Sequence, residues 1–144
     1  MKLDVVFTAT GLTPGEVQGR TVFVIDILRA ATTMCAALTG GARAVVPVAS
    51  TEEALRLAQT LGADETVLGG ERNALPIPGF AVGNSPREMT PEVVRGKTVI
   101  MTTSNGTGAL LTVASAPQVY VACAANFSAV SMRVPWTTSR SRGT

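Results

Sequence analysis

The sequence predicts an α/β fold, in which a mostly parallel sheet carries helices on both of its faces. Short apolar runs rich in β-branched residues alternate with helical patterns, and the links between them are short. Hydrophobic residues make up 46% of the chain but aromatic residues only 4%, so Val, Ala, Leu and Ile must build the core. Such cores are typical of helix-covered parallel sheets.

In the first half of the chain, four apolar runs are predicted to be strands and two segments to be helices. Residues 21–26 form an apolar run that ends in an acid, which suits a central strand. A helical pattern follows over residues 28–39 and is closed by Gly40-Gly41. The next helix opens on the capping box Ser50-Thr51-Glu52-Glu53 and ends at Gly62. The strands cover residues 3–8, 21–26, 44–48 and 66–69.

A segment rich in glycine and proline, from Gly70 to about Met89, opens the second half of the chain. Loops of that length without periodicity are usually functional or disordered. A helix is predicted to start at Thr90-Pro91-Glu92, where Pro takes the first helical position. A strand over residues 98–103, a helix over 106–114 and a strand over 118–122 complete the pattern.

Residues 131–144 differ from the rest of the chain and are predicted to lie outside the fold. They hold the single Trp and three Arg, with no acidic residue and no periodicity. A helix starts near Asn126 and is not completed before this segment, which indicates the cut or frame-shifted end of a longer protein. A disordered native terminus is the alternative. Residues 1–130 are therefore predicted to form the α/β domain, followed by a disordered tail over residues 131–144.

The charge distribution argues against nucleic acid as a partner. Because three of the 12 basic residues lie in residues 131–144, 9 basic and 10 acidic residues remain, without a basic stripe or interleaved aromatics. No run of about 18 uncharged apolar residues is present, so no membrane span is expected. The first residues, which include Asp4, are not expected to form a signal peptide. Cys35 and Cys123 lie far apart in apolar surroundings, so reduced thiols in a cytoplasmic protein are expected.

Several familiar catalytic motifs are missing from the sequence. It contains no histidine, which excludes a serine triad and removes the commonest transition-metal ligand. It has no P-loop, and no acid follows Gly106 to serve a dinucleotide turn. No Arg lies six residues after Cys35, and no Asp lies two residues after Asp26. These absences argue against Cys-loop and aspartyl-phosphate phosphatases.

Ligands of open parallel sheets bind beyond the carboxyl ends of the strands, and four such ends here are polar or rich in glycine. At the first, Asp26 ends a predicted strand and Arg29, Thr32 and Thr33 follow it. A buried acid is costly unless it is paired, hydrogen-bonded or bound to a cation, and Arg29 could hold an anion beside it. The alternative is that Asp26 caps the helix and pairs with Arg29.

The other three ends follow the later strands. Gly69-Gly70 lets the backbone approach a ligand and delivers Glu71 and Arg72 together, although a solvated loop pair is an alternative. Asn84 and Ser85 lie in the long loop, where they could equally form a turn. Free backbone N–H groups near Asn105, Gly106 and Thr107 suit a phosphate or sulfonate, with a turn and helix cap as the alternative.

Taken together and in this order, the four segments resemble the 2-phosphosulfolactate phosphatase family. The resemblance covers roughly residues 4–130, and it implies an α/β fold that is incomplete here, because full-length members are longer by roughly another half. It rests on Val24-Ile25-Asp26-Ile27-Leu28-Arg29-Ala30 with Thr32-Thr33, Leu68-Gly69-Gly70-Glu71-Arg72, Ile77-Pro78-Gly79-Phe80 with Gly83-Asn84-Ser85-Pro86, and Thr102-Thr103 with Asn105-Gly106-Thr107.

The resemblance implies Mg²⁺-dependent hydrolysis of 2-phospho-3-sulfolactate, or of another small phosphorylated acid, to the hydroxy acid and phosphate. This reaction is a step toward coenzyme M in some organisms. Asp26 and Glu71 would be catalytic carboxylates that hold the metal. Arg29 and Arg72 would neutralise phosphate or sulfonate. Further contacts to the anion are expected from Thr32, Thr33, Asn84, Ser85, Asn105, Gly106 and Thr107.

The sequence departs from the family pattern at three positions, and two other functions stay open. Ala31 stands where Thr is expected, Ala81 where Asp is usual, and Gly108 where a basic residue often follows. One alternative is a non-catalytic remnant that binds a small anion or pairs with another copy into a homo-oligomer through an exposed sheet edge. The other is a nucleotide-binding domain.

Overall fold

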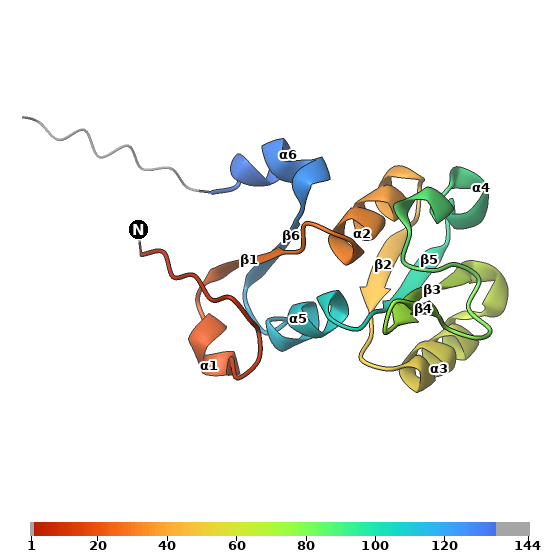
Figure 1. The fold of residues 1–144 in the computed structure, drawn as a ribbon, viewed down its shortest axis with the longest axis horizontal. Coiled ribbons are helices and arrows are strands. Elements are labelled where there is room, and N and C mark those ends of the chain that lie inside the picture. Colours follow the sequence, from red (N-terminus) through yellow and green to blue (C-terminus); the bar gives the residue numbers. More distant parts are fainter. Residues whose placement is uncertain (1, 135–144) are drawn as a thin grey trace, which may run out of the picture.

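The computed structural model describes residues 2–134, whose strands form two separate sheets (Figure 1). The larger sheet has the order β2-β5-β3-β4, and its first three strands are parallel. The smaller sheet is the parallel pair β1-β6. The strands are β1 (Thr21–Ile25), β2 (Ala44–Pro47), β3 (Thr66–Arg72), β4 (Leu75–Pro76), β5 (Thr98–Thr102) and β6 (Gln118–Ala122).

Helices cover both faces of the larger sheet, as the sequence predicts. On one face, Ala37 of α2 and Val94 of α4 pack in a single apolar cluster with Val67 and Val99. On the other face, Ala54 and Ala58 of α3 pack against Ile100. The helices are α1 (Pro14–Val17), α2 (Ala30–Thr39), α3 (Thr51–Leu61), α4 (Pro91–Val94), α5 (Gly106–Thr112) and α6 (Phe127–Ser131), with short 3₁₀ turns at Ala63–Glu65, Pro86–Glu88 and Ala124–Asn126. The predicted α/β class is therefore confirmed.

The start of α3 shows how the local sequence sets an element boundary. The Ser50 side chain accepts a hydrogen bond from the Glu53 N–H at 3.1 Å, as the capping box predicts. The Glu53 carboxylate reaches back one residue further than expected and accepts from the Ala49 N–H at 2.9 Å. Both bonds satisfy backbone donors that have no partner within the helix.

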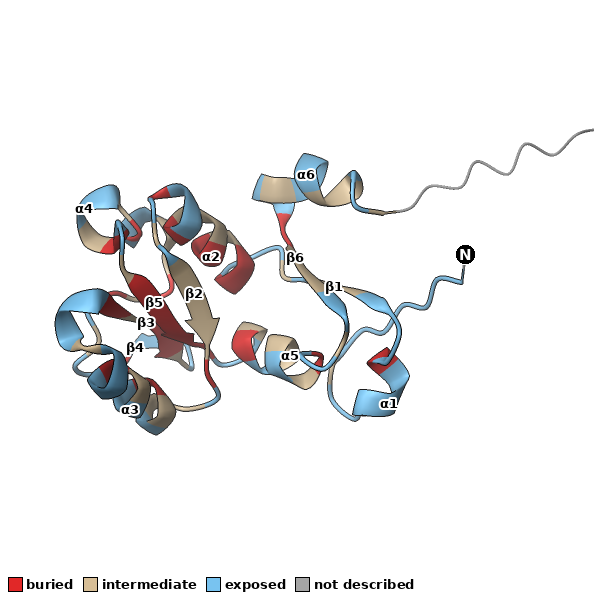
Figure 2. Cartoon of the chain, turned by 180° about the vertical axis from the view of Figure 1, so that it is seen from behind, coloured by how far each residue is buried: buried red, intermediate tan, exposed pale blue. Residues whose placement is uncertain are grey.

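The smaller sheet is less well covered than the larger one (Figure 2). β5 is buried at all five positions, whereas β1 has exposed residues at both ends and half-buried residues between them. Ile25, the last residue of β1, is 69% exposed. One apolar cluster approaches this sheet, in which Val121 of β6 packs near Ala30, Met34 and Met101.

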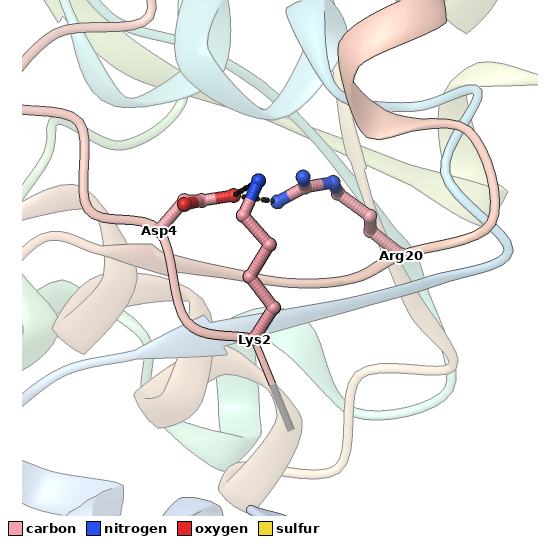
Figure 3. A network of polar contacts seen from close by, with 3 residues as sticks. All are labelled: Lys2, Asp4 and Arg20. Atoms are coloured by element: carbon pink, nitrogen blue, oxygen red, sulfur yellow. Dashed lines mark hydrogen bonds and ion pairs between the residues drawn. The ribbon is translucent and has the colours of Figure 1, made fainter.

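The predicted strand over residues 3–8 is wrong. The chain has no regular structure there, and Phe7 is fully exposed. β1 pairs only with β6 among the described residues, so an apolar run at the N-terminus finds no strand to pair with. Asp4 instead contacts the side chains of Lys2 and Arg20 (Figure 3), and the hydrogen bond from Arg20 lowers its pKa.

The segment from Gly70 to Met89 is more ordered than a long loop. β3 continues to Arg72 and turns through Asn73 and Ala74 into β4. Both turn residues have positive φ, 52° and 64°, as a two-residue hairpin turn requires.

The helix predicted over residues 106–114 ends at Thr112. Of the predicted tail, residues 135–144 lie outside the described residues. No helix within residues 2–134 has the length and apolar character that crossing a membrane would need.

Candidate active site

A cavity of about 360 Å³ lies where β1, β3 and β5 reach their carboxyl ends. Three of its lining residues, Asp26, Glu71 and Asn105, come from separate segments and meet in this one space. The structure therefore brings together the segments that are predicted from the sequence to bind one ligand. The lining residues are Asp26, Leu28, Arg29, Ala30, Glu71, Asn73, Ala74, Asn84, Thr103, Ser104, Asn105 and Gly106.

Asp26 directly follows β1 and is half-buried. Its backbone N–H donates to the carbonyl of Ala122 at 2.9 Å, which continues the pairing of β1 with β6. A Cβ atom placed on Gly106 would lie 2.7 Å from Asp26 Oδ2 and 2.6 Å from Ala30 Cβ. Gly106 thus lets the carboxylate lie against the backbone at the start of α5.

The alternative role for Asp26, a helix cap paired with Arg29, is not seen. Arg29 itself occupies the N-cap position of α2, and no side chain makes a cap hydrogen bond there. No ion pair within residues 2–134 joins Asp26 to Arg29. Both side chains instead line the cavity.

Glu71 is the most tightly held carboxylate of the site, with 8% of its surface exposed. Its Oε1 accepts from the Ser104 N–H at 2.8 Å, and its Oε2 accepts from the Ala74 N–H at 2.7 Å and the Ser104 hydroxyl at 3.0 Å. Burial raises the pKa of Glu71, but these hydrogen bonds and the nearby charge of Arg29 outweigh it, and the pKa is lowered overall. Glu71 is therefore a fixed, ionised group that joins β3 to the segment after β5.

Asn84 lines the cavity and carries a buried acceptor that has no partner among the described residues. Its side chain is 8% exposed, and Oδ1 has no hydrogen-bond partner among the described residues. Its backbone carbonyl accepts from the buried Thr33 hydroxyl at 3.3 Å, which fixes the residue in place. A buried acceptor without a partner is costly, and a bound ligand or ion would satisfy it.

Arg72 does not line the cavity. Its guanidinium donates to the Thr103 carbonyl at 2.8 Å, the Thr102 hydroxyl at 2.7 Å and the Ala49 carbonyl at 2.9 Å. These bonds connect Arg72, at the end of β3, to the end of β5 and to the segment after β2. The anion-binding role predicted for Arg72 has no support in this position, because its donors serve the fold.

Four other predicted contacts also lie outside the cavity lining. Thr107 is buried and its hydroxyl accepts from the Thr103 N–H at 3.0 Å, so it shapes the turn before α5. Thr33 donates to the carbonyls of Arg29 and Asn84. Ser85 precedes the 3₁₀ turn Pro86–Glu88, and Thr32 lines a second cavity beside α2. Of the predicted residues, the structure brings together Asp26, Arg29, Glu71, Asn84, Asn105 and Gly106.

Two features of the site are not predicted from the sequence. Ser104 holds both oxygens of Glu71, and its hydroxyl also accepts from the Asn73 N–H at 2.8 Å. Asn73 and Ala74 reach the cavity through a hairpin turn, where the sequence predicts a long loop. Asn after a strand was the one available signal for that turn.

The cavity offers hard oxygen donors and a cationic rim. No group of three or more His, Cys, Asp or Glu side chains within residues 2–134 could hold a metal by itself. The Asp26 carboxylate and the unpartnered Asn84 Oδ1 nevertheless fit the preference of Mg²⁺ for a few protein oxygens plus water and phosphate oxygens. Arg29 is exposed at the edge of the cavity, where its guanidinium suits an oxyanion.

Comparison with known proteins adds independent information. The sequence model of a family described as 2-phosphosulpholactate phosphatase matches residues 6–138. A probable 2-phosphosulfolactate phosphatase of Caldanaerobacter subterraneus is 44% identical over 131 residues, which are 91% of this chain and 54% of that relative. Proteins of the same name from Clostridium acetobutylicum and Symbiobacterium thermophilum are 42% and 48% identical over 93% and 80% of this chain. They are covered to 57% and 49%, so the chain spans about half the length of these relatives.

Proposed function

The chain belongs to the 2-phosphosulfolactate phosphatase family, and from this premise we propose that it contributes the catalytic cavity of an Mg²⁺-dependent phosphatase. The proposed substrate is 2-phospho-3-sulfolactate or a related small phosphorylated acid, and the products are the hydroxy acid and phosphate. The observation that carries the proposal is the meeting of Asp26, Arg29 and Glu71 in one polar cavity.

Arg29 and two backbone amides are proposed to bind the oxyanion. The N–H groups of Asn105 and Gly106 have no acceptor among the described residues, and both residues line the cavity. Arg29 adds a full positive charge, whose effect already reaches Glu71. A guanidinium with adjacent N–H donors matches the oxygens of a phosphate or a sulfonate.

Asp26 and Asn84 are proposed to hold Mg²⁺, which when bound would polarise the phosphoryl group. Asp26 supplies the negative charge and Asn84 supplies its free Oδ1. Glu71 has three of its acceptor positions filled by Ser104 and Ala74, so it keeps the cavity wall in place and adds negative charge. The proposal differs from the expectation that Asp26 and Glu71 both hold the metal.

The test is phosphate release from 2-phospho-3-sulfolactate by the whole chain, with and without Mg²⁺. The replacement Asp26→Asn should abolish Mg²⁺-dependent release while the circular dichroism spectrum stays unchanged. Arg56→Gln, an exposed change outside the cavity, serves as the matched control and should keep full activity. Unaltered turnover in Asp26→Asn would remove Asp26 from the mechanism.

A non-catalytic, self-associating protein is the second candidate function. The apolar side chains of Phe7, Ile25 and Phe127 are exposed, and contact with another copy of the chain would bury them. Absence of Mg²⁺-dependent phosphate release by the wild-type chain, together with a dimer in analytical ultracentrifugation, would support this candidate over the phosphatase.

A further inference from the structure

The two cysteines of the chain meet, although 88 positions separate them in the sequence. Cys35 lies in α2 and Cys123 directly follows β6, and their Sγ atoms are 3.9 Å apart. Both are free thiols. Because the chain has no third cysteine, each thiol has a single intramolecular partner.

The two thiols differ in access to solvent. Cys35 is half-buried and lines a second cavity of about 430 Å³, beside Thr32, Ala36 and Asn126. Cys123 is 3% exposed and does not line this cavity. A small reagent can therefore reach Cys35 first, and only Cys35 can reach Cys123.

We propose that Cys35 and Cys123 form a redox modification site, separate from the catalytic cavity, that a small-molecule disulfide converts into an intramolecular disulfide. In the first step the Cys35 thiolate attacks one sulfur of the reagent and releases one thiolate. In the second step the Cys123 thiolate attacks the Cys35 sulfur and releases the other. The cysteines lose two protons and two electrons in total, and the reagent is reduced to two thiols.

The surroundings of the pair suit the second step. Burial raises the pKa of Cys123, but nearby donors outweigh it and lower the pKa overall, chiefly the Thr32 hydroxyl and the backbone N–H groups of Asn126 and Ala125. Burial, with the adjacent Cys123, raises the pKa of Cys35 to about 11, so the first step is the slow one at neutral pH.

The disulfide would add a covalent link between the end of β6 and α2, which otherwise meet through apolar packing. β6 pairs with β1, and Asp26 directly follows β1. α2 begins at Ala30, after its N-cap residue Arg29, and packs on the larger sheet. A covalent link from Cys35 to Cys123 would hold these parts together. The closed loop is long, so its loss of unfolded-state entropy is large.

The experiment treats the whole native chain with glutathione disulfide and follows it by intact mass spectrometry. The expected product is lighter by two hydrogen atoms, and proteolysis without reductant should yield a peptide that joins Cys35 to Cys123. Its Tm should exceed that of the reduced protein by about 5–10 °C, and dithiothreitol should reverse the change.

Two serine variants serve as controls. Cys123→Ser should keep one glutathione on Cys35, and Cys35→Ser should stay largely unmodified because Cys123 is buried. A stable glutathione adduct on the wild-type chain, a disulfide-linked dimer or no reaction would each overturn the proposal. None of these outcomes bears on the phosphatase proposal, which uses neither cysteine.

Discussion

Two strands with similar sequences have different surroundings in this molecule. β1 reads Thr-Val-Phe-Val-Ile and β5 reads Thr-Val-Ile-Met-Thr. β5 lies between β2 and β3, under helices on both faces, and Val99, Ile100 and Met101 are each 0% exposed. β1 has one partner, β6, and its last residue Ile25 is 69% exposed. An apolar pentapeptide therefore indicates a strand, while topology decides how deeply the strand is buried.

The candidate site takes residues from both of these regions, which differ in how deeply they are buried. Asp26 continues the exposed strand β1, whereas Glu71 comes from β3, whose position is fixed by the buried strand β5. One wall of the cavity is thus held by a packed core, and the other by a lightly covered strand pair. Substitutions in the two regions test this contrast.

The largest effect is expected from Gly70→Ala in the buried region. Gly70 has φ of 140°, and a Cβ atom there would lie 1.9 Å from the Thr102 carbonyl oxygen of β5. The strands would have to separate, so unfolding free energy should fall by about 4 kcal/mol or more. Urea denaturation measures this loss. Gly108→Ala, where the added methyl meets nothing within 4 Å, is the matched control and should be neutral or slightly stabilising.

A pair of isoleucine variants compares the two strands directly. Ile100→Ala should lower the free energy of unfolding by about 2–5 kcal/mol, because it empties a fully buried position of β5. Ile25→Ala in β1 should change it by about 0.5 kcal/mol or less, because that side chain is already exposed. Similar losses in both variants would show that β1 is covered in solution.

Glu71→Gln should lower the free energy of unfolding by about 1–3 kcal/mol at neutral pH. Glutamine has one acceptor oxygen, so its NH₂ group would face an N–H or O–H donor of Ser104 or Ala74. Folding lowers the pKa of Glu71 below its ordinary value of 4.5, so its stabilisation is present above that pH and is lost as the pH falls through the lowered value. The stability gap between wild type and variant should therefore close on acidification. A gap that stays constant down to about pH 2 would contradict this account.

Much of the larger sheet could be predicted because its signals are local. The capping box at Ser50 and the apolar run of β5 each specify an element without reference to the rest of the chain. The run over residues 3–8 failed because a strand also requires a partner, and pairing is not local. The β3–β4 turn was missed because Ala74 adopts a positive φ that glycine usually supplies.

The candidate site could be predicted in outline but not in detail. The rule that ligands bind at the carboxyl ends of parallel strands correctly brought Asp26, Glu71 and Asn105 together. That rule does not give side-chain direction, so it could not show that Arg72 turns back to bind Thr102 and Thr103. The contact between Cys35 and Cys123 could not be predicted from the sequence either, because it depends on how α2 packs against the end of β6.

The most direct test of the shared cavity is calorimetric titration of inorganic phosphate, in the presence of Mg²⁺, into wild type, Arg29→Gln and the control Arg56→Gln. Phosphate should bind the wild type and the control with equal affinity. Arg29→Gln should weaken binding about tenfold or more, because one charge-assisted contact is lost. Equal phosphate affinity in wild type and Arg29→Gln, or no phosphate binding to the wild type, would contradict the claim that this cavity binds an oxyanion.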